Sequence, residues 1–249
     1  MQVLAKLCLI PLAFAFPSQR RADRPVYWLL AGDSTTAPKG GWGDGFLATT
    51  VAPGSSGHNY GHSGATTASF RSGGDWAKVI ADIGTFKKDY EVYVTIQAIT
   101  LFGHNDQKSN SGVTLDQYKT NLQQFAAESK SAGATPILVT PLTRRTFKDG
   151  KVVENLAEQR NATISVAQAN SIGFIDLTLK SENYVNALGQ SVVSRYNYQP
   201  EDWTHLNEWG GVVFARIVSD LLVGKFPVLK AATKANETMS ALIEAGKPA

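Results

Sequence analysis

Compact apolar runs alternate along this chain with longer stretches in which apolar residues recur at helical spacing. The runs predict strands at 26–31, 91–102, 135–140 and 173–177, and a turn at 53–57 leads into a shorter strand at 58–60. The spaced stretches predict helices at 42–51, 69–83, 114–132, 152–170 and 206–223. Strands separated by helices predict an α/β fold, a three-layer α/β/α sandwich around a central parallel sheet.

Two of these elements have distinctive boundaries. Thr114 begins a helix, because Gln117 stands three positions later in the pattern of a capping box, and Gly133 ends it. The run from Glu91 to Phe102 is long for a single strand, so we expect a bulge or a bend near Ala98.

Length and charge indicate one ordinary globular domain, which we place at residues 26–226. The chain has 249 residues, and a core of roughly 200 residues buries about 70% of its unfolded surface. The net charge is +3 and the basic residues are scattered, which excludes the concentrated basic patch of a nucleic-acid-binding protein. Residues 227–249 are rich in Ala, Lys and Glu, and we expect either a loosely docked helix or a disordered tail there.

Residues 1–25 indicate a signal peptide followed by a short pro-segment. Residues 3–16 are almost entirely apolar, but the run is too short to span a membrane. Ala13-Phe14-Ala15 has the small-x-small pattern of a cleavage site. We therefore expect a secreted, extracellular protein; the alternatives are a mistaken start and a disordered extension. Removal of the signal takes Cys8, the single cysteine, and leaves a mature chain without disulfides.

Two Asn-x-Thr triplets, at Asn161 and Asn236, have the pattern of glycosylation sites. They matter only if a eukaryotic cell secretes the chain, and such triplets also arise by chance.

Hydroxyl, imidazole and carboxylate groups stand where the predicted elements begin and end. Ser34 follows the first strand across Gly32-Asp33, where a serine can present its oxygen at the rim of the sheet. Asp202 lies three residues before His205, so a tight turn would let the carboxylate orient the imidazole as a general base for Ser34. The plain alternatives are an ordinary turn around Ser34 and a surface histidine behind a capping aspartate.

Two further residues are candidates for stabilising a developing oxyanion. Asn105 closes the long central strand, and its side-chain amide can donate a hydrogen bond. Gly64 follows the second strand, where a glycine lets the backbone approach a ligand closely. The alternatives are an asparagine that bonds its own backbone and a flexible loop glycine. Nucleophile, base, orienting carboxylate and oxyanion donor together are the minimum equipment for hydrolysing an ester by covalent catalysis.

The blocks Gly-Asp-Ser-Thr at 32–35, the Gly64 loop, Gly-His-Asn-Asp at 103–106 and Asp-x-x-His at 202–205 resemble those of the SGNH (GDSL-type) hydrolases. The stretches LAGDSTTA, GWGDGF, FGHND, GATPILVTPLTRR and THLNEWG are similar to the rhamnogalacturonan acetylesterase branch of that superfamily. The resemblance covers roughly residues 26–226 and is more specific than any single motif.

The resemblance implies a flavodoxin-like catalytic domain that removes acetyl groups from pectic polysaccharide without a metal or cofactor. Ser34 would be the nucleophile, His205 the base and Asp202 the residue that orients it. The N–H groups of Ser34 and Gly64 and the side chain of Asn105 would form the oxyanion hole. The expected partner is an acetylated polysaccharide, with no nucleic acid and no membrane for the mature form, and we expect a monomer.

Four residues are candidates for contacts with the substrate. Arg144 and Arg145 could meet the carboxylates of pectin, although paired arginines in a loop are more often simply solvated. His104 and Trp203 could contact sugar or pack beside the site.

Two other functions stay open from the sequence. One is an esterase that acts on another acetylated plant-wall polysaccharide or on a small ester, because a fold does not determine a substrate. The other is an inactive glycan-binding protein, which the unusual length of the 91–102 run suggests.

Overall fold

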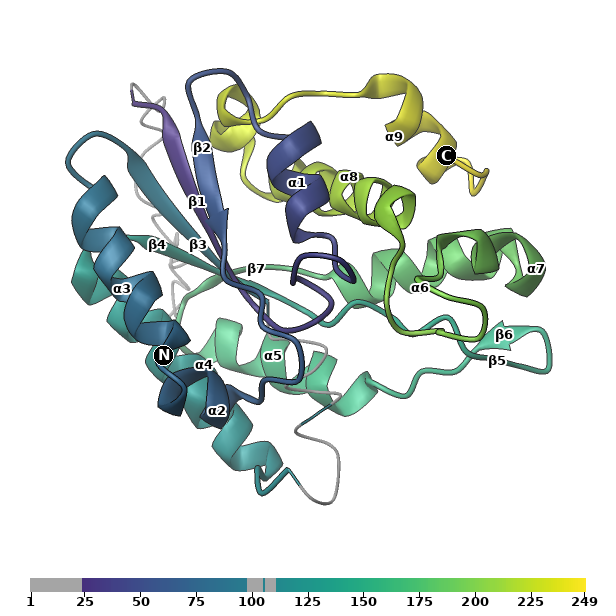
Figure 1. Cartoon of the computed structure of the whole chain (residues 1–249), viewed down its shortest axis with the longest axis horizontal. Helices are drawn as coiled ribbons and strands as arrows, with labels where there is room; N and C mark the ends of the chain where they lie inside the picture. Colours follow the sequence, from purple (N-terminus) through teal and green to yellow (C-terminus); the bar gives the residue numbers. More distant parts are fainter. Residues whose placement is uncertain (1–23, 98–104, 106–110) are drawn as a thin grey trace, which may run out of the picture.

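A parallel sheet of five strands forms the centre of the protein (Figure 1). The computed structural model describes residues 24–97, Asn105 and residues 111–249. The strands are β1 Val26–Ala31, β2 Ser56–Asn59, β3 Glu91–Gln97, β4 Thr135–Val139 and β7 Gly173–Ile175. Their order across the sheet is β2, β1, β3, β4, β7, and every neighbouring pair is parallel.

Helices cover both faces of this sheet (Figure 1). On one face lie α2 Thr67–Ser72, α3 Asp75–Phe86, α4 Leu115–Ala132 and α5 Ala157–Ala169. On the other lie α1 Gly43–Thr49, α6 Leu177–Leu188, α7 Gln190–Val193, the 3-10 turn η2 Ser194–Tyr196 and α8 Glu208–Lys225. This arrangement confirms the three-layer α/β/α sandwich with a parallel sheet.

The alternation of side chains along β1 divides the core into two halves. Every second residue from Val26 onward packs with α1, α6 and α8, and the residues between them, from Tyr27 onward, pack with α3, α4 and α5. All six residues of β1 are buried, because this strand has a neighbour on each side and a helical layer on each face.

The predicted helix at 114–132 is confirmed in detail. Thr114 caps α4, accepting a hydrogen bond from the Gln117 N–H while the Gln117 side chain accepts from the Thr114 N–H. Gly133 ends the helix in the left-handed conformation.

Three of the predicted helices have wrong boundaries. The stretch 69–83 belongs to two helices, α2 and α3, because Gly73-Gly74 interrupts it. The stretch 152–170 begins in a small hairpin, β5 Phe147–Lys148 with β6 Lys151–Val152, and helix α5 starts only at Ala157. The last predicted helix runs on through Gly224 to Lys225. Helices α6 and α7 were not predicted.

The described part of the predicted long strand is β3, Glu91–Gln97. The bend expected near Ala98 and the candidate His104 lie outside the described residues, as do residues 1–23 of the predicted signal segment. No helix in the described ranges is long and apolar enough to span a bilayer.

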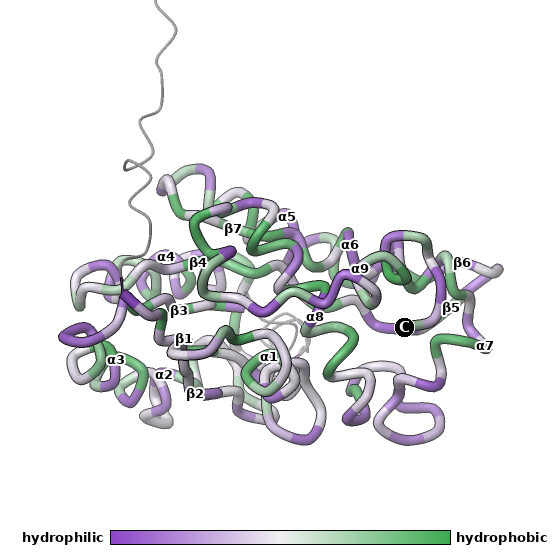
Figure 2. Tube along the Cα trace, turned by 90° about the horizontal axis from the view of Figure 1, so that it is seen from above, coloured by the Kyte–Doolittle hydropathy of each residue, from purple (hydrophilic) through white to green (hydrophobic). Residues whose placement is uncertain are grey.

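Of the two alternatives for residues 227–249, a docked helix and a disordered tail, the docked helix is the one observed. Residues after 226 form the 3-10 segment η3 Pro227–Ala232 and the helix α9 Glu237–Glu244. Leu229 and Ile243 are buried in the same core as α8, beside which α9 lies in both views (Figures 1 and 2). The Ala249 carbonyl accepts hydrogen bonds from the Tyr196 hydroxyl and Trp209 Nε1. The burial of Leu229 and Ile243 and the hydrogen bonds of Ala249 therefore hold residues 227–249 against the rest of the domain.

The strand order determines where a site can form. The chain proceeds outward from β1 to β2 and then returns to the other side of β1 with β3, so the topological switch lies between β1 and β3. In open parallel sheets, ligands bind at the carboxyl ends of the strands at such a switch. Ser34 follows β1 and Asn105 comes after β3, so both belong to the loops at this point.

Candidate active site

A tight turn after β1 carries Ser34. The Asp33 carboxylate accepts a hydrogen bond from the Thr35 N–H at 2.7 Å, and the Asp33 carbonyl accepts from the N–H groups of Thr36 and Ala37 at 3.0 and 2.6 Å. These bonds close the turn around Ser34, which is only 4% exposed. Ser34 therefore lies, as predicted, in a turn directly after the first strand, one residue beyond Asp33.

The end of the central strand holds this turn in place. Gln97 is fully buried, and its Oε1 accepts hydrogen bonds from the Thr36 hydroxyl and, at 2.8 Å, from Trp42 Nε1. Its Nε2 donates to the Thr35 hydroxyl at 3.4 Å. A Cβ on Gly41 would lie 2.3 Å from the Thr35 backbone, so only glycine allows this close approach. The residues that follow Ser34 are therefore fixed from two sides.

Asp202 and His205 lie in the loop between η2 and α8. The loop is held to its neighbours by hydrogen bonds from the Leu206 N–H to the Gly40 carbonyl at 2.8 Å and from the Tyr198 N–H to the His205 carbonyl at 2.9 Å. Gly40 in turn borders the Ser34 turn, because a Cβ there would stand 3.3 Å from the Ser34 carbonyl and 3.7 Å from His205 Cδ2. The loop and the turn are thus in contact, although more than 160 residues separate them.

Ser34, His205 and Asp202 form one chain of hydrogen bonds. Ser34 Oγ lies 2.6 Å from His205 Nε2, and His205 Nδ1 lies 3.0 Å from the nearer Asp202 oxygen. A carboxylate only accepts hydrogen bonds, so Nδ1 carries the ring proton and donates it to Asp202. Nε2 is then the acceptor for the Ser34 hydroxyl, which is the arrangement that a general base requires.

The same aspartate organises its own loop. Asp202 Oδ1 accepts hydrogen bonds from the N–H groups of Thr204 and His205 at 3.1 and 2.9 Å. Burial alone would raise the pKa of Asp202, but the bonds from the His205 N–H, the His205 ring and the Thr204 N–H outweigh it and place the pKa below the ordinary value. Asp202 is therefore a carboxylate at neutral and mildly acidic pH.

The two oxyanion candidates lie together on the next loops. Asp33 and His62 form a parallel bridge, which places the loop after β2 beside the Ser34 turn. Gly64 follows in this loop with φ of +83°, a conformation that favours glycine, and is exposed. Asn105 is buried and its Nδ2 donates to the Ala65 carbonyl at 3.2 Å. The structure therefore gathers the Gly64 loop and Asn105 at the same end of the sheet as Ser34.

The structure separates the candidates for substrate contact. Arg145 is fully buried and its guanidinium donates to carbonyl oxygens of the protein, so the expectation that it meets substrate is wrong. Arg144 is half-buried, and this burial lowers the pKa of its guanidinium. Trp203 is partly exposed in the same loop as His205. Arg144 and Trp203 therefore remain candidates.

The family model of the GDSL-like lipases and acylhydrolases matches residues 30–211 of the chain. The chain belongs to the GDSL-like lipase/acylhydrolase family. This acylhydrolase is accordingly an ester hydrolase, and both Ser34 and His205 lie within the matched residues.

Relatives of this acylhydrolase point in the same direction. Rhamnogalacturonan acetylesterase RhgT of Bacillus subtilis is 30% identical to it over 217 residues, which cover 79% of this chain and 89% of that protein. The crystal structure of protein YXIM from Bacillus subtilis superposes with a TM-score of 0.65 at 23% identity, over 80% of this chain and 56% of that one. A catalytic mutant of Axe2, an acetylxylan esterase from Geobacillus stearothermophilus, gives a TM-score of 0.59 at 16% identity, over 87% of this chain and all of that one. The resemblance to the SGNH superfamily and its rhamnogalacturonan acetylesterase branch is confirmed.

Two polar side-chain arrangements of the acylhydrolase had escaped sequence reasoning. Gln97 is one, and its only sequence signal is a polar residue in a β-branched run. The other is a second histidine–aspartate pair, in which His62 Nδ1 lies 2.5 Å from Asp75 Oδ2 while Lys78 Nζ contacts Asp75 Oδ1 at 2.9 Å. His62 and Asp75 are 13 residues apart, and no helical or strand spacing links them.

Other expected sites can be placed on the acylhydrolase. Asn161, on α5, and Asn236, which caps α9, are both exposed, as a glycosylation site must be. In the described parts of the chain, no group of three or more His, Cys, Asp or Glu residues is arranged to hold a metal ion.

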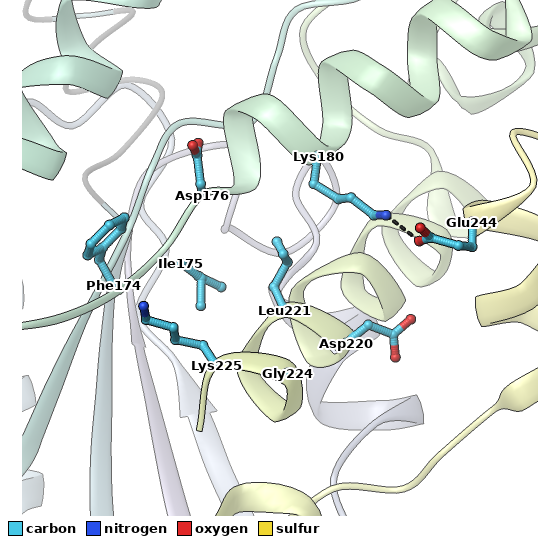
Figure 3. A pocket seen from close by; sticks show the side chains of 9 residues that line it. All are labelled: Phe174, Ile175, Asp176, Lys180, Asp220, Leu221, Gly224, Lys225 and Glu244. Carbon is cyan, nitrogen blue, oxygen red and sulfur yellow. Dashed lines mark hydrogen bonds and ion pairs between the residues drawn. The ribbon is translucent and has the colours of Figure 1, made fainter. Parts of the chain in front are cut away.

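A pocket of about 420 Å³ lies away from the hydrogen-bonded Ser34, His205 and Asp202, where edge strand β7 meets α6, α8 and α9 (Figure 3). The side chain of Lys180 reaches across it to Glu244, and Asp176 at its border is paired with Arg160. None of Ser34, Asp202 and His205 lines it. The lining residues are Phe174, Ile175, Asp176, Lys180, Asp220, Leu221, Gly224, Lys225 and Glu244.

We expect Asn105→Ala to lower kcat by on the order of 10²–10³, because that is the effect of losing one donor to a tetrahedral oxyanion. KM for a small ester should change little, since the bond strengthens only in the transition state. Asn121→Ala is the matched control, because Asn121 also donates from its side chain, but to Thr67. Steady-state rates with p-nitrophenyl acetate measure both. An unchanged kcat in Asn105→Ala would mean that its amide does not reach the reacting carbonyl.

Proposed function

We propose that this acylhydrolase is a secreted carbohydrate esterase that removes acetyl groups from pectic rhamnogalacturonan by a covalent Ser–His–Asp mechanism. The observation that carries the mechanism is the 2.6 Å contact between Ser34 Oγ and His205 Nε2, with Asp202 on the opposite ring nitrogen. The substrate rests on the 30% identity to a rhamnogalacturonan acetylesterase and on the motifs shared with that branch.

The first half of the reaction acylates the serine. Ser34 Oγ attacks the acetyl carbonyl carbon while its proton passes to His205 Nε2, and Asp202 stabilises the imidazolium that forms. The carbonyl oxygen becomes an oxyanion, which the N–H groups of Ser34 and Gly64 and the amide of Asn105 would stabilise. The intermediate then collapses, the ester bond breaks, and His205 gives the proton to the departing sugar oxygen, which leaves as a hydroxyl.

The second half releases acetate. Water gives a proton to His205 Nε2 and attacks the acetyl-Ser34 carbonyl, and the resulting intermediate breaks the bond to Ser34 Oγ. His205 then returns the proton to Ser34. Each proton taken by His205 is given back, so Ser34 and His205 return to their starting protonation states at the end of the cycle.

Acetate release from different polymers tests the substrate class. Acetylated rhamnogalacturonan, acetylated xylan and p-nitrophenyl acetate should be compared at equal concentrations of ester groups. We expect kcat/KM to be clearly greatest on rhamnogalacturonan. Equal turnover of xylan and pectin would contradict the pectic assignment and favour an esterase of wider range.

Export is the remaining part of this proposal. It rests on the apolar run at 3–16, the Ala13-Phe14-Ala15 pattern and the extracellular location of the polymer. N-terminal sequencing of the protein from culture medium should find a chain that begins after Ala15. A chain that stays in the cells and retains Cys8 would contradict export.

A further inference from the structure

Arg145 is a buried arginine that binds the loop of Asp202 and His205 (the 202–205 loop) rather than a ligand. It is 0% exposed and lies in the segment that follows β4. Its backbone N–H donates to the Trp203 carbonyl at 2.7 Å. Its Nε donates to Asn197 Oδ1 at 2.7 Å, beside the same loop.

The guanidinium takes the other carbonyls of this loop. Nη2 donates to the carbonyl oxygens of His205, at 2.6 Å, and of Asp202, at 3.3 Å, and Nη1 donates to that of Thr204, at 3.3 Å. With the Trp203 bond, all four consecutive carbonyls from 202 to 205 accept a hydrogen bond from Arg145.

These bonds place Arg145 and Asp202 on opposite sides of the same peptide groups. In a trans peptide the C=O and the following N–H point in opposite directions, and the described chain has no cis peptide. The 203–204 peptide gives its C=O to Arg145 and its N–H to Asp202 Oδ1, and the 204–205 peptide does the same. The orientation of both planes, and so the direction in which His205 leaves the backbone, depends on the two residues together.

The charge of Arg145 suits a residue that binds backbone carbonyls. Among the described residues no carboxylate forms an ion pair with it, and burial lowers its pKa to about 10, against the opposing effect of Asp202. The guanidinium is therefore charged at neutral pH and is satisfied by amide and carbonyl oxygens. Replacing a buried charged residue with an apolar one often leaves a protein equally stable, so stability alone does not explain an arginine here. A guanidinium has five N–H donors in a fixed plane and can therefore bind several carbonyls at once.

We propose that Arg145 is a positioning residue, which holds the 202–205 loop so that Asp202 and His205 meet Ser34 at hydrogen-bonding distance. The inference rests on the proposed esterase function. It assigns to Arg145 no contact with substrate or with the reacting atoms.

Arg145→Met and Arg145→Lys test this assignment, with Arg216→Met as the matched control. Arg216 is also buried and donates to a carbonyl, that of Lys234 at 2.7 Å, but it belongs to α8 and ties the C-terminal segment. Each variant is assayed on p-nitrophenyl acetate below its own unfolding temperature, with kcat calculated per folded protein.

We expect Arg145→Met to lose kcat by on the order of 10²-fold, the effect of displacing a catalytic group by about 1 Å, while KM stays nearly the same. Arg145→Lys should not restore kcat, because an ammonium lacks the planar fork. Arg216→Met should unfold at a lower temperature but keep its kcat.

A second readout is the downfield proton resonance of His205 Nδ1–H, which reports its bond to Asp202. We expect this resonance to be lost or broadened in both Arg145 variants and retained in Arg216→Met. If Arg145 contributed only to stability, its replacement would lower the unfolding temperature without changing the His205 Nδ1–H resonance.

The outcomes separate the two proposals. If the wild-type protein does not hydrolyse p-nitrophenyl acetate, or Ser34→Ala still does, the proposed function fails. If activity depends on Ser34 but the Arg145 variants match Arg216→Met in kcat and resonance, only the positioning role is overturned. Should Arg145→Met not fold, Arg145→Lys decides, because lysine keeps the charge and most of the volume.

Discussion

Ser34→Ala should lower kcat for acetyl esters by roughly 10⁶, the loss found when the nucleophile of a serine triad is removed. The reason is that, within the described part of the chain, the hydroxyl bonded to His205 is that of Ser34, whose Oγ lies 2.6 Å from Nε2. Alanine gives up this one bond and leaves the turn, which Asp33 and Gln97 hold, intact. Rates on p-nitrophenyl acetate, with unfolding temperatures for both proteins, measure the effect.

His205→Ala should have an effect of similar size, and the double variant should lose no more than either single one, because the two residues act as a unit. Ser63→Ala is the control, an exposed serine in the neighbouring Gly64 loop, and it should keep its activity. If Ser34→Ala and the wild type hydrolyse the ester equally, another nucleophile is at work. If neither hydrolyses any acetyl ester, the protein is an inactive glycan-binding member of its family.

Asp202→Asn should lower kcat by about 10⁴, with folding preserved. An asparagine oxygen can still accept from the N–H groups of Thr204 and His205, so the loop keeps its bonds. The amide, however, can donate to Nδ1, which then loses its proton to Nε2. An imidazole with its proton on Nε2 cannot accept the proton of Ser34, so the base is lost although the geometry remains.

Asp75→Asn is the matched control for this change, because Asp75 is also a carboxylate paired with a histidine. Its contacts are with His62 and Lys78 rather than with His205, so it should keep most of its kcat. Steady-state rates from pH 5 to 9 compare the two variants on p-nitrophenyl acetate. A loss in Asp202→Asn no greater than in Asp75→Asn would contradict the orienting role of Asp202.

Local signals in the sequence predicted those parts of the fold that local interactions determine. The capping box at Thr114 and the six apolar residues of β1 specify a helix start and a buried strand without reference to the rest of the chain. The spacing of Asp202 and His205 likewise predicted a contact that a single turn can make, and the structure has it.

Several features that depend on contacts between distant parts of the chain could not be predicted from the sequence. Arg145 looked like a surface arginine, because its four carbonyl partners lie in a loop some 60 residues away. The composition of the C-terminal segment left a docked helix and a disordered tail both open, and the choice depends on the burial of a few apolar residues, such as Leu229 and Ile243, in the core that the earlier helices form. Gln97 and the His62–Asp75 pair were missed for the same reason.

A covalent adduct at the nucleophile can be located directly. The protein is inactivated with a p-nitrophenyl phosphonate, digested, and its peptides are sequenced by mass spectrometry, with His205→Ala treated in parallel. The expected result is one phosphonyl group, on Ser34, whose formation follows the loss of activity and is far slower without His205. An adduct on any other residue, or full inactivation with Ser34 unmodified, would contradict the mechanism.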